Sequence, residues 1–130
     1  MKVDDLNVLL TQNAGLQADV HDTFITSTWK ISDKVQKQIV FFPDDETKLL
    51  YMSILFEERN QEPAFLSALL KENLKLSVVK FCMDKDGGFM VLAELPDDFV
   101  NVDLIRKVLF GLFTAAGRFQ ELLASTATKK

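Results

Sequence analysis

The sequence has few of the residues from which disulfide-bonded, metal-binding or catalytic proteins are built. Its 130 residues include one cysteine, Cys82, and one histidine, His21. A single cysteine excludes an intrachain disulfide, and one cysteine with one histidine cannot form a structural zinc site. The N-terminal residues also lack the basic segment and apolar stretch of a secretory signal. These shortages predict a cytoplasmic protein without a metal.

Long apolar runs and an excess of basic residues are missing as well. Charged residues interrupt every apolar segment well before the ~20 residues that a membrane-spanning helix needs. Asp and Glu number 19 against 15 Lys and Arg, which gives a formal net charge of -4. Nucleic acids and anionic membranes both attract basic surfaces. The sequence therefore predicts a soluble protein that binds neither nucleic acid nor membrane.

The residues that are present are sufficient for one hydrophobic core. Apolar residues make up 48% of the chain, and no linker or repeat divides it, so residues 1–130 are predicted to form a single domain. Eleven phenylalanines stand against one tyrosine and one tryptophan. Phenylalanine supplies apolar area without a polar group, and such a surplus suits an interface as well as a core.

Hydrophobic periodicity predicts an α+β fold with the order α-βββ-α-ββ-α, an antiparallel sheet packed against helices. Helical spacing is found at 3–10, 60–73 and 102–123, and strand-like alternation at 23–31, 35–42, 48–57, 76–83 and 89–95. Asp86-Gly87 predicts a tight hairpin between the last two strands. Residues 125–130 are expected to lie beyond the last helix.

The register of the first three strands divides their side chains between two faces. With Ile31 opposite Val35 and Phe42 opposite Leu49, one face becomes densely apolar and is predicted to be the core beneath the helices. Lys37 is the misfit on that face. Two explanations stay open for it: the aliphatic stem extends outward, or a bulge shifts the register.

The other face carries an apolar group at one end, among polar residues. Its members are predicted to bind a partner: Phe24, Val40, Phe42, Leu49 and Tyr51. Phe24 is expected opposite Phe42, and Tyr51 beside Val40. Two interpretations stay open, since the group is either covered by the first helix or a loop, or exposed and used by a partner or second subunit.

Candidate catalytic residues are isolated from one another. Cys82 lies within a predicted strand, and His21 follows the first helix, so a nucleophilic pair would have to form across the fold. The segment Asp84–Gly88 lacks the spacing and closing glutamate of a calcium loop, and no helix follows its glycines to bind a phosphate. The acidic clusters lie at predicted turns. The sequence thus predicts no catalytic, cofactor-binding or metal-binding residues.

The second half of the chain resembles a known family. The segment Leu69–Asn73, a strand, the turn Asp84–Gly88, a strand ending in Glu94–Pro96 and a long helix resemble the bacterial YbjN-like family. That family is similar in fold to the class I chaperones of type III secretion. The resemblance implies a homodimeric binding module that holds an extended client segment on hydrophobic patches, with no known reaction.

The predicted function is non-enzymatic protein binding, chaperone-like or regulatory, by a homodimer that uses apolar sheet surface or sheet-edge pairing. No cofactor is expected. The alternative is a small-molecule-binding protein or enzyme with a site between the sheet and the C-terminal helix. A polar-lined cavity there would favour the alternative, and a solid core would remove it.

Overall fold

A computed structural model describes residues 1–127 and confirms the α+β fold. The helices are α1 (Val3–Val8), α2 (Pro63–Glu72) and α3 (Val102–Ala127), with a short π-helical segment η1 (Leu9–Asn13) after α1 and a 3-10 turn η2 (Asp97–Phe99) before α3. The strands are β1 (Asp19–Val20), β2 (Ile25–Ser32), β3 (Val35–Asp44), β4 (Leu49–Leu55), β5 (Lys80–Met83) and β6 (Phe89–Pro96). Strand β1 was not predicted, because two residues are too few to show a period.

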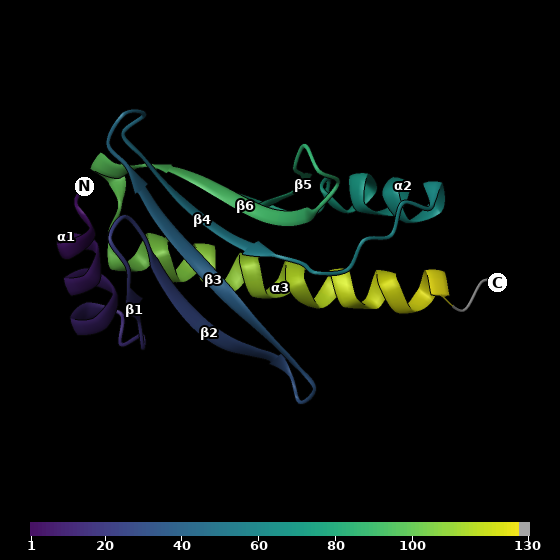
Figure 1. Cartoon of the computed structure of the whole chain (residues 1–130), viewed down its shortest axis with the longest axis horizontal. Coiled ribbons are helices and arrows are strands. Elements are labelled where there is room, and N and C mark those ends of the chain that lie inside the picture. The colour runs from purple at the N-terminus through teal and green to yellow at the C-terminus, as the bar shows by residue number, and fades with distance from the viewer. Residues whose placement is uncertain (128–130) are drawn as a thin grey trace.

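The strands form one six-stranded antiparallel sheet in the order β1-β2-β3-β4-β6-β5. After α2 the chain returns to the β4 side, where β6 pairs with β4 and β5 lies outside it. Figure 1 shows α3 running along one face of the sheet, with α1 at the end near the N-terminus and α2 beside β5. The opposite face of the sheet carries no helix among residues 1–127.

The core lies between the sheet and α3. Ile39, Phe41, Met52 and Ile54 are fully buried on the inner face, as the alternation predicted. From α3, the buried residues are Ile105, Val108, Leu109, Leu112, Ala115, Ala116 and Phe119. Helix α1 adds Leu6 and η1 adds Leu10. The first helix therefore packs on the inner side.

Five of the eleven phenylalanines form one aromatic cluster around Phe119. The ring of Phe56 stacks on Phe119 with the two centroids 3.9 Å apart. Phe65 meets the same ring edge-on, and Phe81 and Phe89 complete the group. Much of the phenylalanine surplus therefore belongs to the core.

The predicted register is wrong at both ends of β3, although the faces are correct. A bulge between Lys30 and Ser32 places Ser32, and not Ile31, opposite Val35. At the other end β3 continues through Pro43, which lies beyond the last residue pair with β2, where a missing N–H is tolerated.

This extension shifts the β3–β4 pairing by two residues. Phe42 lies opposite Tyr51 and not Leu49, and Val40 lies opposite Ser53. Phe24 precedes β2 and is not paired with Phe42. Because side chains alternate with a period of two, a two-residue shift leaves every residue on its predicted face.

Lys37 stays in register opposite Trp29, so no bulge occurs at this position. Its Nζ lies 3.4 Å from Glu58 Oε2 and 5.6 Å from the centroid of the Phe56 ring. The ammonium group thus has an anion and an aromatic face as neighbours, which makes its position beside the core acceptable.

Two predicted boundaries are also wrong. Strand β5 begins at Lys80 and not near Leu76, because Val78 adopts a positive φ of 71° that interrupts the extended chain. Helix α3 continues to Ala127, so Ser125 to Ala127 are helical and not beyond the helix. Residues 128–130 lie outside the described part of the chain.

Candidate functional site

Four of the five predicted partner-binding residues lie on the outer face of the sheet, and three of them are brought together there. Phe42 of β3 and Tyr51 of β4 are direct cross-strand neighbours whose ring centroids are 6.1 Å apart and nearly parallel. Val40 lies two residues before Phe42 on the same face. Phe42 is 38% exposed, and the other two are half-buried. We call Val40, Phe42 and Tyr51 the outer patch.

The remaining two predicted residues border this patch. Leu49 begins β4 on the same face as Tyr51 and lies opposite Asp44 and Pro96. Phe24 lies in the turn between β1 and β2, where its ring stacks on His21 with centroids 4.4 Å apart. The structure therefore groups Leu49 with the outer patch and places Phe24 beside His21.

Neither the core nor α1 covers Phe42. The buried core and the partly buried residues packed against it come from the inner face, and within residues 1–127 they do not include the outer patch. The first turn of α1 reaches the end of β3 and forms one wall of a groove there, together with Phe42. The apolar ring consequently borders open space.

Further apolar side chains extend the outer patch across the sheet. Leu55 of β4 is 51% exposed and lies opposite Met90 of β6, which in turn lies opposite Cys82 of β5. Leu92 lies opposite Ser53. The sequence analysis did not identify these residues, although the unbroken apolar run Phe89–Ala93 indicates a strand that is apolar on both faces. We call Leu55, Met90, Leu92 and Cys82, together with the outer patch, the outer band.

A groove lies at the end of the sheet beside Phe42. It has a volume of about 630 Å³. Its walls are the first turn of α1, the β1–β2 turn and the end of β3. Its apolar side chains include Met1, Val3, Phe42 and Val20, and Val20 is 47% exposed. We call it the end groove.

The two edges of the sheet differ. Strand β1 pairs only with Ile25 and Thr26, so in the described chain β2 has no neighbouring strand on that side from Ser27 to Ser32. At the other edge, the side chain of Asn73 occupies β5: Phe81 N–H donates to Asn73 Oδ1 at 2.7 Å, and Asn73 Nδ2 donates to Phe81 O at 3.0 Å. One edge is open and the other is blocked.

A second apolar surface lies between α2 and β5. A groove of about 220 Å³ is lined by Leu66, Leu69, Leu70, Asn73, Phe81, Cys82, Met83 and Phe89. Leu70 is 71% exposed at its rim. Burial raises the pKa of the Cys82 thiol, which keeps it protonated and unreactive at neutral pH. This surface is suited to apolar contact and not to nucleophilic chemistry.

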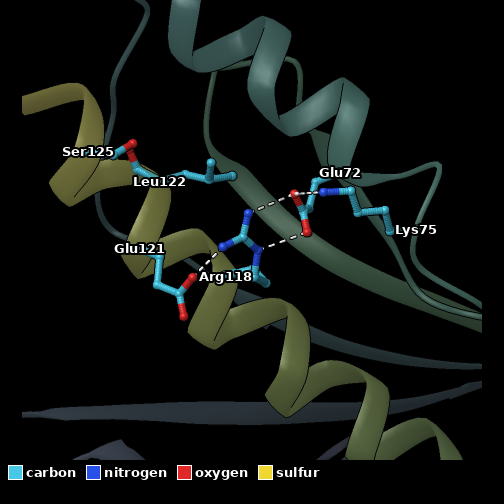
Figure 2. A network of polar contacts seen from close by, with 6 residues as sticks. All are labelled: Glu72, Lys75, Arg118, Glu121, Leu122 and Ser125. Carbon is cyan, nitrogen blue, oxygen red and sulfur yellow. Dashed lines mark hydrogen bonds and ion pairs between the residues drawn. The ribbon is translucent and has the colours of Figure 1, made fainter. Parts of the chain in front are cut away.

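An ion-pair network holds α2 against α3, as Figure 2 shows. Glu72 of α2 is 6% exposed, and its carboxylate accepts hydrogen bonds from Arg118 Nε at 2.9 Å and from Arg118 Nη2 at 3.1 Å. Arg118 also contacts Glu121, and Lys75 Nζ lies 3.9 Å from Glu72. The Arg118 hydrogen bonds hold the pKa of Glu72 below its ordinary value. The network fixes the helix that carries the α2–β5 surface.

The isolated polar residues do not come together into a reactive site. His21 adjoins the β1 edge and Cys82 the β5 edge, at opposite ends of the strand order. Within residues 1–127, no group of three or more His, Cys, Asp or Glu side chains could hold a metal ion. Asp84 accepts backbone hydrogen bonds from Asp86 and Gly88, and the Gly88 bond is the main cause of its lowered pKa. That carboxylate shapes a hairpin turn.

The space between the sheet and α3 is filled by side chains. Phe41, Met52, Leu112 and Phe119 meet there with no exposed surface. These buried side chains occupy the place where the alternative site between the sheet and the C-terminal helix was expected. Of the helices in residues 1–127, none is both long and apolar enough to cross a bilayer.

Comparison with known proteins gives structural likeness without sequence likeness. No family model matches the chain, and no curated protein matches it in sequence. It is similar to a chain of the HopA1–SchA chaperone–effector complex, with 19% identity, a TM-score of 0.63, and coverage of 88% of this chain and 93% of that one. It is also similar to a chain of the heterodimeric ExoU–SpcU complex from the type III secretion system of Pseudomonas aeruginosa, with 18% identity, a TM-score of 0.60, and coverage of 89% and 94%.

These likenesses establish the class of fold. The chain has the α+β fold with a six-stranded antiparallel sheet that is found in type III secretion chaperone structures. At such low identity the likeness concerns the fold alone. Relation to the YbjN-like family in particular stays a prediction.

Proposed function

We propose that the chain is a non-enzymatic, chaperone-like module that holds an extended segment of a partner protein against the outer band. The observation that carries this proposal is the Phe42–Tyr51 pair, an aromatic pair on a helix-free sheet face with Phe42 38% exposed. A contiguous apolar surface of this kind marks an interaction site. The similar chain from a chaperone–effector complex supports a protein as the partner.

The open edge of β2 supports an extended conformation for the bound segment. Beyond Thr26 the outward backbone groups of β2 have no neighbouring strand in the described chain. A partner strand added there would gain main-chain hydrogen bonds while its side chains reach the outer face. Edge pairing would supply affinity, and the outer band would supply selectivity.

The proposed homodimer forms along α2. Leu66 and Leu70 lie four residues apart on α2, Leu74 lies in the turn directly after the helix, and Leu70 and Leu74 are exposed. Such a ridge packs well against a copy of itself, because the four-residue ridges of two helices interdigitate in a two-fold arrangement. Since Asn73 blocks the adjacent β5 edge, side chains and not added strands would form this interface.

We propose that residues 1–130 form one domain that acts in the cytoplasm. The half-buried Cys82 stays a free thiol there. We further propose that the chain is related to the YbjN-like family, which the second half of its sequence resembles. The alternative small-molecule or enzyme site was expected beneath α3, where the side chains of the core are buried.

A matched pair of variants tests the outer patch. A fluorescent peptide would first be selected for binding to the wild-type chain from a random display library. Phe42→Ser should weaken its binding at least about tenfold, since loss of an aromatic anchor costs about 2 kcal/mol or more. Phe99→Ser is the control, because Phe99 is 70% exposed in η2, outside the outer face.

Fluorescence anisotropy measures the binding, and circular dichroism checks that both variants fold. Equal binding by wild type and Phe42→Ser would contradict the proposal, as would an equal loss in the two variants. Unfolding of Phe42→Ser would place Phe42 in the core and remove the patch assignment.

A further inference from the structure

The end groove differs from the rest of the outer surface in its charge. Four carboxylates line it, from Asp4, Asp22, Asp44 and Asp45, whereas the lining includes two cationic groups, the Lys2 side chain and the amino terminus of Met1. Within the described chain, Asp4 and Asp22 form no hydrogen bond or ion pair. Both carboxylates are exposed, and no partner within the described residues neutralises them.

The other two carboxylates of the groove have partners within the chain. Asp44 accepts hydrogen bonds from Glu46 N–H and Thr47 Oγ1, which use only part of the capacity of its two oxygens. Asp45 Oδ1 lies 3.7 Å from the amino nitrogen of Met1, whose hydrogen bond goes instead to Asp97 at 2.9 Å. The groove therefore has an excess of negative charge.

Apolar side chains lie within the same groove. Val20 and Phe42 are both in its lining, and Phe42 continues directly into the outer patch through Tyr51. On β6, the strand beside β4, the exposed residue Glu94 lies opposite Tyr51. Acidic groups thus border the apolar residues on two sides.

From this arrangement we infer that the partner segment is cationic and amphipathic: it carries Lys or Arg within one or two residues of an apolar side chain that contacts Phe42. The inference rests on the proposed function, because the end groove opens onto the outer patch. An acidic segment would meet four carboxylates, and like charges at an interface are strongly unfavourable. A basic segment would pair with them at the same time as it buries Phe42.

Three labelled synthetic peptides test the inference. All have the same alternating apolar positions, and the intervening positions are all Lys, all Ser or all Glu. We expect the Lys peptide to bind about tenfold more tightly than the Ser peptide at low salt, from two or three partly exposed ion pairs of ~0.5 kcal/mol each. The Glu peptide should bind most weakly. High salt should reduce the Lys preference, because it screens exposed charges.

Two double variants assign the preference to the groove. Asp22→Asn with Asp45→Asn should lower the Lys-to-Ser affinity ratio several-fold and leave Ser-peptide binding unchanged. The control, Asp33→Asn with Asp86→Asn, makes the same change in net charge at the β2–β3 and β5–β6 turns, outside the groove. This control should retain most of the preference for the Lys peptide. That result would separate the effect of local ion pairing from the effect of net charge.

The outcomes distinguish this inference from the proposed function. If the three peptides bind equally and Phe42→Ser weakens them all, the charge inference is wrong and the proposed function stands. Equal loss of the Lys preference in both double variants would likewise overturn the role of the groove. If no peptide binds, or if Phe42→Ser leaves binding unchanged, the proposed function is wrong and the inference falls with it.

Discussion

The two faces of the sheet are built from the same strands and differ sharply in burial. Phe41 and Phe42 are consecutive residues of β3, yet Phe41 has no exposed surface and Phe42 is 38% exposed. Phe41 packs under α3, whereas Phe42 stacks beside Tyr51 on the helix-free face. In one strand, therefore, alternate residues belong to the core and to the face that the proposed function uses.

The largest expected effect is a difference in the free energy of unfolding between variants of these two residues. Phe41→Ala should lower the free energy of unfolding by about 3–5 kcal/mol, because it leaves a cavity in the core. Phe42→Ala should lower it by less than about 1 kcal/mol, since the ring is already partly in water. Chemical denaturation measures both values. Similar losses in the two variants would show that the outer face is not separate from the core.

A smaller effect is expected where α2 meets α3. Glu72→Gln should lower the free energy of unfolding by about 1–3 kcal/mol at neutral pH, because it removes the charge from a carboxylate hydrogen-bonded to Arg118. The control is Glu121→Gln, which removes the other Arg118 contact at a side chain that is 65% exposed. Its cost should stay below about 0.5 kcal/mol.

The same variant has a defined pH dependence. The pKa of folded Glu72 is lowered by Arg118, so the ion pair contributes its full stability above the ordinary value of 4.5 and loses it as the pH falls through the lowered pKa. The stability difference between wild type and Glu72→Gln should therefore shrink in acid. A difference that grows below pH 4.5 would contradict this assignment.

The smallest expected effect on folding sharpens the distinction between the α2–β5 surface and the outer face. Leu70→Glu should change the free energy of unfolding by less than about 0.5 kcal/mol, because the side chain is mostly in water. It should nevertheless convert the proposed dimer to a monomer in light scattering. Leu55→Glu, on the outer face, is the control and should leave the mass unchanged. A monomeric wild type, or a dimeric Leu70→Glu, would remove the α2 interface.

The fold could be predicted from the sequence mainly because side-chain alternation is insensitive to small errors of register. Phe42 was expected opposite Leu49 and lies opposite Tyr51, yet all three side chains stay on the outer face. Loop lengths could not be predicted with the same success. Pro43 was expected to end β3, and only the absence of a neighbouring β2 residue explains why the strand continues.

The candidate site was predictable only in part, because its boundaries depend on strand order. Val40, Phe42 and Tyr51 follow from the alternation of adjacent strands. Met90 and Leu92 join them only because β6 lies next to β4, which no local pattern specifies. The end groove depends on β1, whose two residues show no period, and on where α1 docks.

The contact between Asn73 and Phe81 has a consequence for how the molecule behaves at high concentration. A strand-to-strand polymer grows only if each unit offers two free sides, one to accept a strand and one to donate the next. The side-chain amide of Asn73 hydrogen-bonds to the backbone of β5 and so occupies one of these sides. Growth would then stop after a single addition. The proposed strand-accepting side of β2 is thus compatible with a protein that does not form fibres.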